Sequence, residues 1–272
     1  MNVLSVFDGI SCAYQALNRS GIRLEKYYAS EIDKNAIIIS QKNHPDIIQL
    51  GDIKQIDGKL LPKIDLLIGG SPCQDLSIAN KDRKGLEGER SGLFWEYVRL
   101  LQEIKPKWFI LENVASMSQE DKETITKALK VEPVMFNASL VSAQCRKRYF
   151  WTNIKFDLPE DRGILLKDIL QNDAEVNERM NATPKSNNNQ ANRVYDINRK
   201  SICLKANGGG LGAKTGLYKI DARIRKLTPI ECERLQGLPD DYTKGIAMTN
   251  RYKAIGNAFN VDVVTHILCF IK

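Results

Sequence analysis

One short stretch of the chain combines a reactive side chain with an abrupt turn. Residues 69–77 read GGSPCQDLS, and they follow an apolar run, IDLLIGG, that has the composition of a buried strand. Pro72 fixes its own φ and disfavours helix at the residue before it, so the chain turns just ahead of Cys73. A thiol at a strand end can act as a nucleophile, whereas most single cysteines are small buried side chains. The stretch leaves both roles open for Cys73.

A carboxyl group stands on the next predicted strand, KWFILENV (107–114), which carries Glu112 close to its end. Burial at such a position favours the neutral form of a carboxyl, which can then donate a proton. A helix cap or an ion pair is the structural alternative for Glu112. If the two strands are parallel neighbours, Cys73 and Glu112 face one pocket.

Two arginines follow in the segment QCRKR (144–148). With the side-chain period of a strand, Gln144, Arg146 and Arg148 share one face. A plain basic edge strand has the same appearance. A cationic side chain beside a thiol lowers its pKa from roughly 8.5 and helps to hold the thiolate.

A thiolate, a carboxylic acid and an arginine pair match one reaction. Carbon 5 of cytosine is a poor nucleophile while the ring is aromatic. Addition of a thiolate at C6, with an acid at N3, turns the ring into an enamine whose C5 can accept a methyl group. Loss of the C5 proton then expels the thiol. These residue types therefore favour methylation of cytosine at C5.

The elements that must position these groups alternate between strand-like and helix-like segments. Short runs rich in Val, Ile, Phe and Tyr predict buried strands, and amphipathic stretches between them predict helices. This alternation predicts an α/β fold with a doubly wound, mostly parallel sheet and with ligands at the carboxyl ends of the strands. The predicted strands span 2–7, 26–32, 47–53, 64–70, 107–114, 134–143 and 148–154, and the clearest helical segments span 13–21, 92–105, 227–237 and 254–271.

Side chains suited to a nucleoside follow the first three predicted strands: Phe7-Asp8-Gly9, Glu31 and Asp52. An acid after the second strand can accept hydrogen bonds from ribose hydroxyls, and one after the third can accept from an adenine amino group. Capping of the following helix is the alternative for each acid. The segment FDGISC has a single glycine and lacks the dinucleotide pattern G-x-G-x-x-G, so an adenosine cofactor without phosphates, S-adenosylmethionine, is favoured.

Composition limits the class of protein without deciding it. The 272 residues carry a formal net charge of +7, which suits a nucleic-acid partner but also arises from solvated lysines. The six cysteines contain no CxxC pair, which argues against a zinc site or a disulfide framework, and no metal is expected. The start of the chain lacks the pattern of a secretory signal, and no apolar run approaches the length of a membrane span. We expect a cytoplasmic protein.

The motifs together resemble the cytosine-5 DNA methyltransferase family, and only about 156–224 lacks the likeness. The match covers the cofactor motifs, SPCQ (71–74), ENV (112–114), Q-x-R-x-R (144–148), RKLTPIECERLQGLP (225–239) and AIGNAFNVDVV (254–264). The catalytic half is similar to the animal de novo methyltransferases, and the closing motifs resemble prokaryotic or phage enzymes. The resemblance implies catalytic roles for Cys73, Glu112, Arg146 and Arg148, and cofactor contacts for Phe7, Asp8, Gly9, Ile10, Glu31, Ile32, Asp52, Ile53 and Asn257.

The resemblance also implies a division of labour along the chain. Residues 1–155 and 225–272 are expected to form the catalytic, cofactor-binding domain, and 156–224 a short target-recognition region, loop-rich between 171 and 200. Segment 74–92 corresponds to a loop that closes over DNA. Predicted contacts to double-stranded DNA are Lys81, Arg83, Lys84, Lys205 and Lys214.

Two features depart from the family pattern, and two other functions remain open. Ser11 and Cys12 stand where the family often has glycines, and the recognition region is short. Transfer RNA is the substrate of one branch of the family, but that branch has a Cys-Phe-Thr segment, whereas Cys269-Phe270 is followed here by Ile271. A non-catalytic regulator would lack the nucleophile or the acid, and both are present. The sequence leaves open a partner restriction endonuclease and whether the protein is a monomer or a dimer.

Overall fold

The computed structural model describes residues 1–72, 91–172, 190–220 and 223–271. The chain forms two compact units. The first comprises Met1–Phe136, Lys147–Leu158 and Val264–Lys272, and the second comprises Asn137–Arg146 and Pro159–Val263. The second unit thus includes residues on both sides of the predicted boundary at 224. The functional division at 156–224 stays a prediction, because compactness does not show which residues read DNA.

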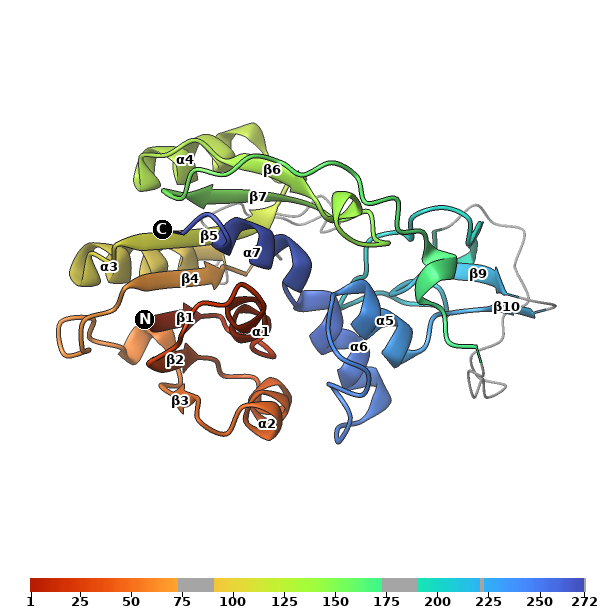
Figure 1. Ribbon diagram of the computed structural model, residues 1–272, viewed down its shortest axis with the longest axis horizontal. Helices are drawn as coiled ribbons and strands as arrows, with labels where there is room; N and C mark the ends of the chain where they lie inside the picture. Colours follow the sequence, from red (N-terminus) through yellow and green to blue (C-terminus); the bar gives the residue numbers. More distant parts are fainter. Residues whose placement is uncertain (73–90, 173–189, 221–222, 272) are drawn as a thin grey trace. The chain divides into compact units, whose positions relative to one another are not determined.

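A seven-stranded sheet is the centre of the first unit, with the strand order β3-β2-β1-β4-β5-β7-β6 (Figure 1). The strands from β3 to β5 are parallel, whereas β7 runs antiparallel to β5. The predicted doubly wound, mostly parallel sheet is therefore confirmed. The strands are β1 (Asn2–Val6), β2 (Lys26–Ser30), β3 (Ile48–Gln49), β4 (Leu66–Gly70), β5 (Trp108–Val114), β6 (Val134–Asn137) and β7 (Lys147–Thr152).

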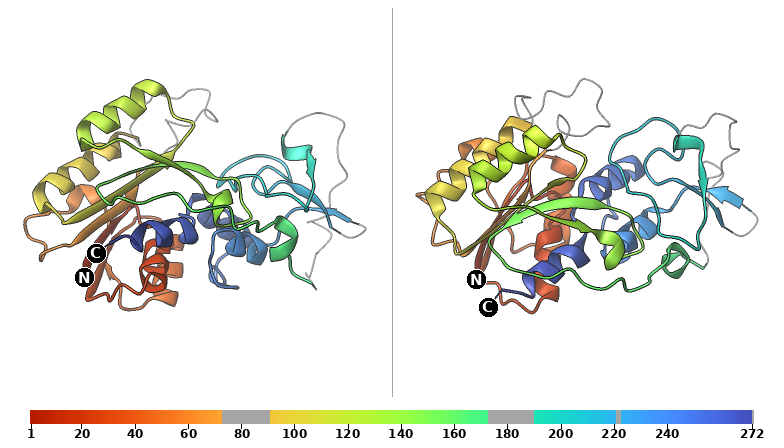
Figure 2. Two further views of the ribbon diagram at one scale, coloured as in Figure 1. Left: turned by 45° about the horizontal axis from the view of Figure 1, so that its top comes forward. Right: turned by 90° about the horizontal axis from the view of Figure 1, so that it is seen from above.

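Helices cover both faces of this sheet (Figures 1 and 2). On one face lie α3 (Phe94–Ile104) and α4 (Gln119–Leu129), and on the other lie α1 (Cys12–Arg19), α2 (Lys34–Asn43) and α7 (Val261–Leu268). The apolar side of α3 buries Phe94 and Tyr97 against the sheet residues Leu67 and Leu111 in a single core. Burial of this apolar area fixes the strands and hence the positions of their carboxyl ends.

The second unit has its own apolar core and a three-stranded sheet of order β10-β9-β8. Tyr218 from the sheet, Leu235 from α5 and Ile255 from α6 are buried in this core. Its elements are β8 (Val194–Tyr195), β9 (Leu217–Ile220), β10 (Arg223–Arg225), α5 (Pro229–Leu235) and α6 (Met248–Asn257).

The start of α5 agrees with its sequence signals. The Thr228 side chain accepts from the main-chain N–H of Glu231, the Glu231 side chain accepts from the N–H of Thr228, and Pro229 occupies the first turn. This reciprocal capping box satisfies two N–H groups that a helix start leaves without partners. Gly237 follows the helix with φ +73°, so the predicted helical segment and its glycine stop are confirmed.

Two predicted elements differ from those observed. The predicted strand 134–143 ends at Asn137, because the Asn137 side chain caps a tight 3-10 turn over Ala138–Leu140. The predicted helix 254–271 is two helices, α6 and α7, interrupted after Asn257. Asn260 causes the second start, since its Oδ1 accepts from the N–H of Val263. Apolar spacing alone did not reveal this side-chain cap.

Candidate active site

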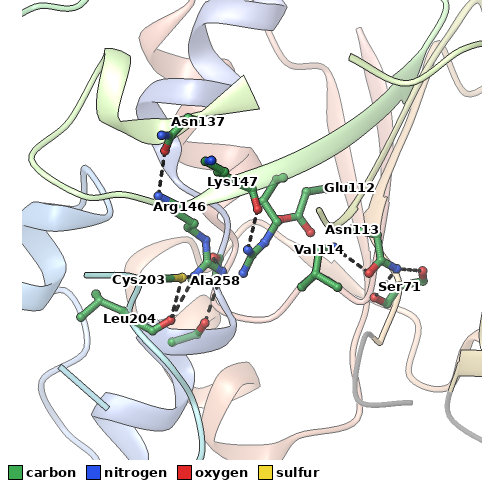
Figure 3. A network of polar contacts seen from close by, with 12 residues as sticks. Ser71, Glu112, Asn113, Val114, Asn137, Arg146, Lys147, Cys203, Leu204 and Ala258 are labelled. Atoms are coloured by element: carbon green, nitrogen blue, oxygen red, sulfur yellow. Dashed lines mark hydrogen bonds and ion pairs between the residues drawn. The ribbon is translucent and has the colours of Figure 1, made fainter. Parts of the chain in front are cut away.

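The carboxyl ends of β4 and β5 lie side by side, since Gly70 pairs with Glu112 in the parallel register. The side-chain amide of Asn113 donates to Ser71 Oγ at 3.0 Å and to the Ser71 carbonyl at 3.3 Å (Figure 3). Ser71 is buried, so its position is fixed by these bonds. Ser71 is two residues ahead of Cys73 in the sequence. Cys73 itself lies outside the described residues.

Glu112 forms an ion pair with Arg148, whose Nε lies 2.7 Å from Glu112 Oε1. Arg148 is opposite Val114 in the antiparallel pair β5–β7, so the two charged side chains are diagonal neighbours. The side chain of Arg148 is 15% exposed and that of Glu112 is 12% exposed, so the pair is within reach of a ligand. The arginine orients the carboxyl group, whose second oxygen can hydrogen-bond to a substrate.

Arg146 belongs to the second unit and is 3% exposed. Its guanidinium donates to the carbonyls of Leu204, Gly256 and Ala258, at 3.2, 3.3 and 2.9 Å (Figure 3). The prediction that Gln144, Arg146 and Arg148 share one face of a strand is wrong, because β7 begins only at Lys147. The side chains of Gln144 and Arg146 bond instead to other segments of their own unit.

The loop after β1 has an unusual backbone. Phe7 and Ser11 have φ +56° and +60°, a left-handed conformation that costs energy for side chains with a Cβ, and Gly9 has φ +61°. Such strain persists only where surrounding bonds impose it. Ser11 Oγ donates to Asp8 Oδ2 at 2.5 Å and also contacts the Ser40 hydroxyl at 2.6 Å.

Asp8 is enclosed beneath this loop rather than displayed on it. It is 5% exposed, and its Oδ1 accepts from the Tyr27 hydroxyl at 2.6 Å. Burial raises the pKa of Asp8 from 3.8 to about 6, although the hydroxyls of Ser11, Ser5 and Tyr27 partly oppose the shift. Any cofactor contact of this residue thus has to come from its main chain.

Glu31 stands at the end of β2 and connects two loops. Its Oε2 accepts from the N–H of Gly9 at 2.8 Å, and its Oε1 accepts from the N–H groups of Ile32 and Asp33. A carboxylate has about four acceptor positions, so three main-chain donors leave room for about one ribose hydroxyl rather than two. Beside it, Ile32 is 70% exposed and offers an apolar surface to a flat ring such as adenine.

The other predicted cofactor residues have different surroundings. The Asp52 side chain caps the 3-10 turn Ile53–Gln55 by accepting from the N–H of Lys54, so the capping alternative is observed for this acid. The side chains of Ile10 and Ile53 are buried, which leaves only their main chains for a ligand. Asn257 is exposed at the end of α6, in the second unit.

The predicted DNA contacts are described only in the second unit. The N–H of Lys205 donates to the carbonyl of Lys214 at 2.9 Å, so these two residues are neighbours at the base of the glycine-rich loop 206–213. Burial lowers the pKa of Lys226, Cys232 opposes the shift, and the charge of Lys214 adds to it to a smaller extent. Lys81, Arg83 and Lys84 lie outside the described residues.

The sequence did not reveal the residues whose side chains fix the positions of the site residues. Asn113 belongs to the ENV motif (112–114), but the motif does not indicate that its side chain fixes Ser71. Gln236 bonds to Gln144 at 3.2 Å and to the carbonyl of Ile255 at 2.8 Å, and no local pattern reports such distant partners. The only signal for Gln236 was its place in the closing motif.

In residues 1–72, 91–172, 190–220 and 223–271, no group of three His, Cys, Asp or Glu side chains is arranged to hold a metal ion. Within the same ranges, no helix combines the length and apolar character needed to cross a bilayer.

The fold and the strand-end residues define an α/β methyltransferase. The family model of the C-5 cytosine-specific DNA methylases matches residues 1–209 and 174–272, and the chain therefore belongs to this family. The family is described as methylating cytosine at C5 in DNA, which is the reaction expected from the thiol, acid and arginine motifs.

Similar proteins agree with this assignment. The chain is 30% identical to the type II methyltransferase M.HhaI of Haemophilus parahaemolyticus, an alignment covering 98% of this chain and 93% of the relative. It is 29% identical to the type II methyltransferase M.Bsp6I of a Bacillus strain, with 98% and 97% covered. The solved structure of the Entamoeba histolytica methyltransferase EhMeth superposes with a TM-score of 0.82 at 17% identity, covering 99% and 97%, and supports the fold alone.

Proposed function

We propose that the enzyme transfers the methyl group of S-adenosylmethionine to C5 of a cytosine flipped out of a specific duplex DNA sequence, through a covalent bond between Cys73 and C6. The observation that supports this most is the paired end of β4 and β5. There Glu112, which is paired with Arg148, lies opposite Gly70 in the parallel register. Gly70 ends β4, the strand that leads to Cys73. Extrusion of the base is required because C6 is inaccessible within the base stack.

The side chains divide the chemistry among them. The Cys73 thiolate supplies an electron pair to C6 while Glu112 hydrogen-bonds at N3, and Arg148 orients Glu112 and contacts the base. The electron pair released at C5 forms the bond to the methyl carbon. A water molecule then removes the C5 proton, the C5–C6 double bond re-forms, and the thiolate leaves C6. Cytosine becomes 5-methylcytosine with no net oxidation.

The cofactor fits the residues at the ends of β1, β2 and β3. S-adenosylmethionine supplies an electrophilic methyl group on a sulfonium and leaves as S-adenosylhomocysteine. Glu31 accepts a ribose hydroxyl with its remaining acceptor position, and the exposed Ile32 side chain covers one face of the adenine. The main chains of residues 7–10 and the side chains of Phe7 and Asp52 complete this part of the site. Asn257, which belongs to the second unit, is proposed from the family motif alone as a contact for the cofactor's methionine end.

DNA is held by basic residues on two segments. Lys81, Arg83 and Lys84 contact phosphates from segment 74–92. Lys205 and Lys214, joined at the base of the loop 206–213, contact the duplex from the recognition region. Phosphate contacts of this kind position a duplex, whereas its sequence is read at base edges.

The first experiment measures transfer of a labelled methyl group to unmethylated duplex DNA, followed by bisulfite sequencing of the product. We expect protection of cytosines in one sequence context by the wild type, and its loss in Cys73→Ala. The matched control is Cys269→Ala, which removes an exposed thiol elsewhere and should retain the wild-type rate. If a folded wild-type protein that binds the cofactor methylates RNA but no DNA, the proposal is wrong.

A further inference from the structure

The end of α6 is held by side chains from distant parts of the sequence. The last carbonyls of a helix lack partners within it and carry partial negative charge. Here Gln236 Nε2 donates to the carbonyls of Ile255 and Ala258, and Arg146 Nη2 donates to those of Gly256 and Ala258. The last turn of α6 contains no basic residue of its own, so Arg146 supplies the favourable positive charge.

The same guanidinium holds a second segment. Arg146 Nη1 donates to the Leu204 carbonyl at 3.2 Å and lies 3.5 Å from Cys203 Sγ (Figure 3). The N–H of Leu204 in turn donates to Gln144 Oε1 at 3.0 Å. One buried arginine and its near neighbour in the sequence therefore fix both main-chain groups of Leu204.

The two segments also touch each other directly. A Cβ added at Gly256 would lie 2.4 Å from the main-chain N of Ala206 and 2.4 Å from the carbonyl carbon of Lys205. Only a glycine permits this approach of two backbones. Segment 203–206 and the end of α6 are thus packed as one block, with Arg146 bonded to both.

This block carries two residues with proposed ligands. Asn257, exposed between the held residues Gly256 and Ala258, is the proposed contact for the cofactor's methionine end. Lys205, next to Leu204, is a proposed DNA contact joined to Lys214. The main chain of neither residue can shift far without disturbing the bonds of Arg146.

We infer that Arg146 is a positioning residue that couples cofactor binding to DNA binding, by fixing Asn257 and segment 203–206 in one arrangement. This inference rests on the proposed function and assigns Arg146 a role different from that of Arg148, two residues further on. Arg148 is the arginine proposed to contact the reacting base through its pair with Glu112, whereas the guanidinium of Arg146 donates to three main-chain carbonyls of its own unit. Binding of either ligand stabilises the arrangement that the other requires.

Arg146→Lys, with Arg148→Lys as its comparator, separates the two roles. Lysine keeps the charge but cannot donate to three carbonyls in the planar geometry of a guanidinium. We expect Arg146→Lys to weaken the Kd for S-adenosylhomocysteine without DNA, and the Kd for DNA, each by about tenfold. Its loss of single-turnover rate at saturation should be smaller than that of Arg148→Lys. Arg148→Lys should lower that rate and leave the Kd for S-adenosylhomocysteine unchanged.

Hydrogen exchange on the wild-type protein tests the coupling without any variant. Addition of S-adenosylhomocysteine alone should slow exchange of the Leu204 and Lys205 amides, as well as amides near Asn257. Slowing near Asn257 with none at 204–205 would overturn the inference. So would an Arg146→Lys protein with unchanged affinities and a lower single-turnover rate. A wild-type protein that shows the coupled exchange but methylates no DNA would contradict the proposed function and leave the coupling supported.

Discussion

Two arginine–glutamate ion pairs, chosen one from each unit, have the same shortest N–O distance and opposite surroundings. In the first unit, Arg148 Nε lies 2.7 Å from Glu112 Oε1, and the side chains are 15% and 12% exposed. In the second unit, Arg225 Nη2 lies 2.7 Å from Glu231 Oε1, and the side chains are 3% and 0% exposed. Distance alone therefore does not distinguish a reactive pair from a structural one.

The difference lies in what else each carboxylate binds. Glu231 accepts two bonds from Arg225 and one each from the N–H groups of Thr228 and Gln171, which fills about four acceptor positions. It joins β10 to the start of α5 and has no capacity for a ligand. Glu112 is oriented by Arg148 and remains within reach of solvent. An ion pair whose carboxylate has all its acceptor positions filled, here called saturated, stabilises the fold. An incomplete pair, in which an acceptor position is left, can bind a substrate.

Glu112→Gln should cause the largest change in activity. An amide of the same shape cannot exchange a proton at N3, and general acid catalysis contributes typically 10²–10⁴-fold. We expect the single-turnover rate of methyl transfer to fall about a thousandfold. The free energy of unfolding should fall by less than it does for the fully enclosed Arg225–Glu231 pair, because this pair keeps some access to solvent. Rapid-quench kinetics and denaturant titration measure the two effects.

The control for this variant is Asp240→Asn, which removes a carboxylate from the exposed Arg234–Asp240 pair. It should retain the wild-type rate, since this pair is exposed to solvent and neither of its residues has a proposed ligand. A Glu112→Gln enzyme with the wild-type rate would show that the incomplete pair is not catalytic and would remove the contrast between the two pairs.

Glu231→Gln should have the opposite pattern. It leaves the Arg225 guanidinium buried without a counter-charge, which costs about 3–5 kcal/mol of stability. The enzyme that remains folded should keep its single-turnover rate at saturating DNA and cofactor. Denaturant titration of the wild type and the variant measures this loss of stability. Asp240→Asn, a control in the same unit, is expected to cost only about 0.2–1 kcal/mol. A loss below about 1 kcal/mol for Glu231→Gln would show that enclosure adds nothing.

The sequence predicted the sheet and its strand ends because these depend on local apolar runs whose burial is collective. It also predicted the start of α5, since the capping box of Thr228 and Glu231 is complete within four residues. Both predictions needed only short-range patterns. The same patterns placed Glu112 beside the strand that leads to Cys73.

The sequence could not separate Arg146 from Arg148, because a period of two implies the same face for both. The separation depends on where β7 begins and on carbonyls that lie 58 to 112 residues away in the chain. Asp8 is a similar case, since it is enclosed in a loop where Phe7 and Ser11 have positive φ. A positive φ at a residue other than glycine cannot be predicted from the residue type.

Asp8 extends the comparison to a buried carboxyl whose described partners are hydroxyls rather than a guanidinium. Because burial raises its pKa from 3.8 to about 6, the folded protein binds a proton more tightly than the unfolded chain. The resulting stabilisation is fully present below pH 3.8 and is lost as the pH rises through about 6, with an upper value of about 3 kcal/mol. Denaturant titrations of wild type and Asp8→Asn between pH 4 and about 7.5 should therefore differ by an amount that declines with pH and then levels off.

Tyr27→Phe removes a donor that favours the ionised form of Asp8, so it should move the decline to higher pH. Parallel curves for wild type and Asp8→Asn would show that the enclosed carboxyl titrates as it does in the unfolded chain, and that burial among hydroxyls costs it nothing.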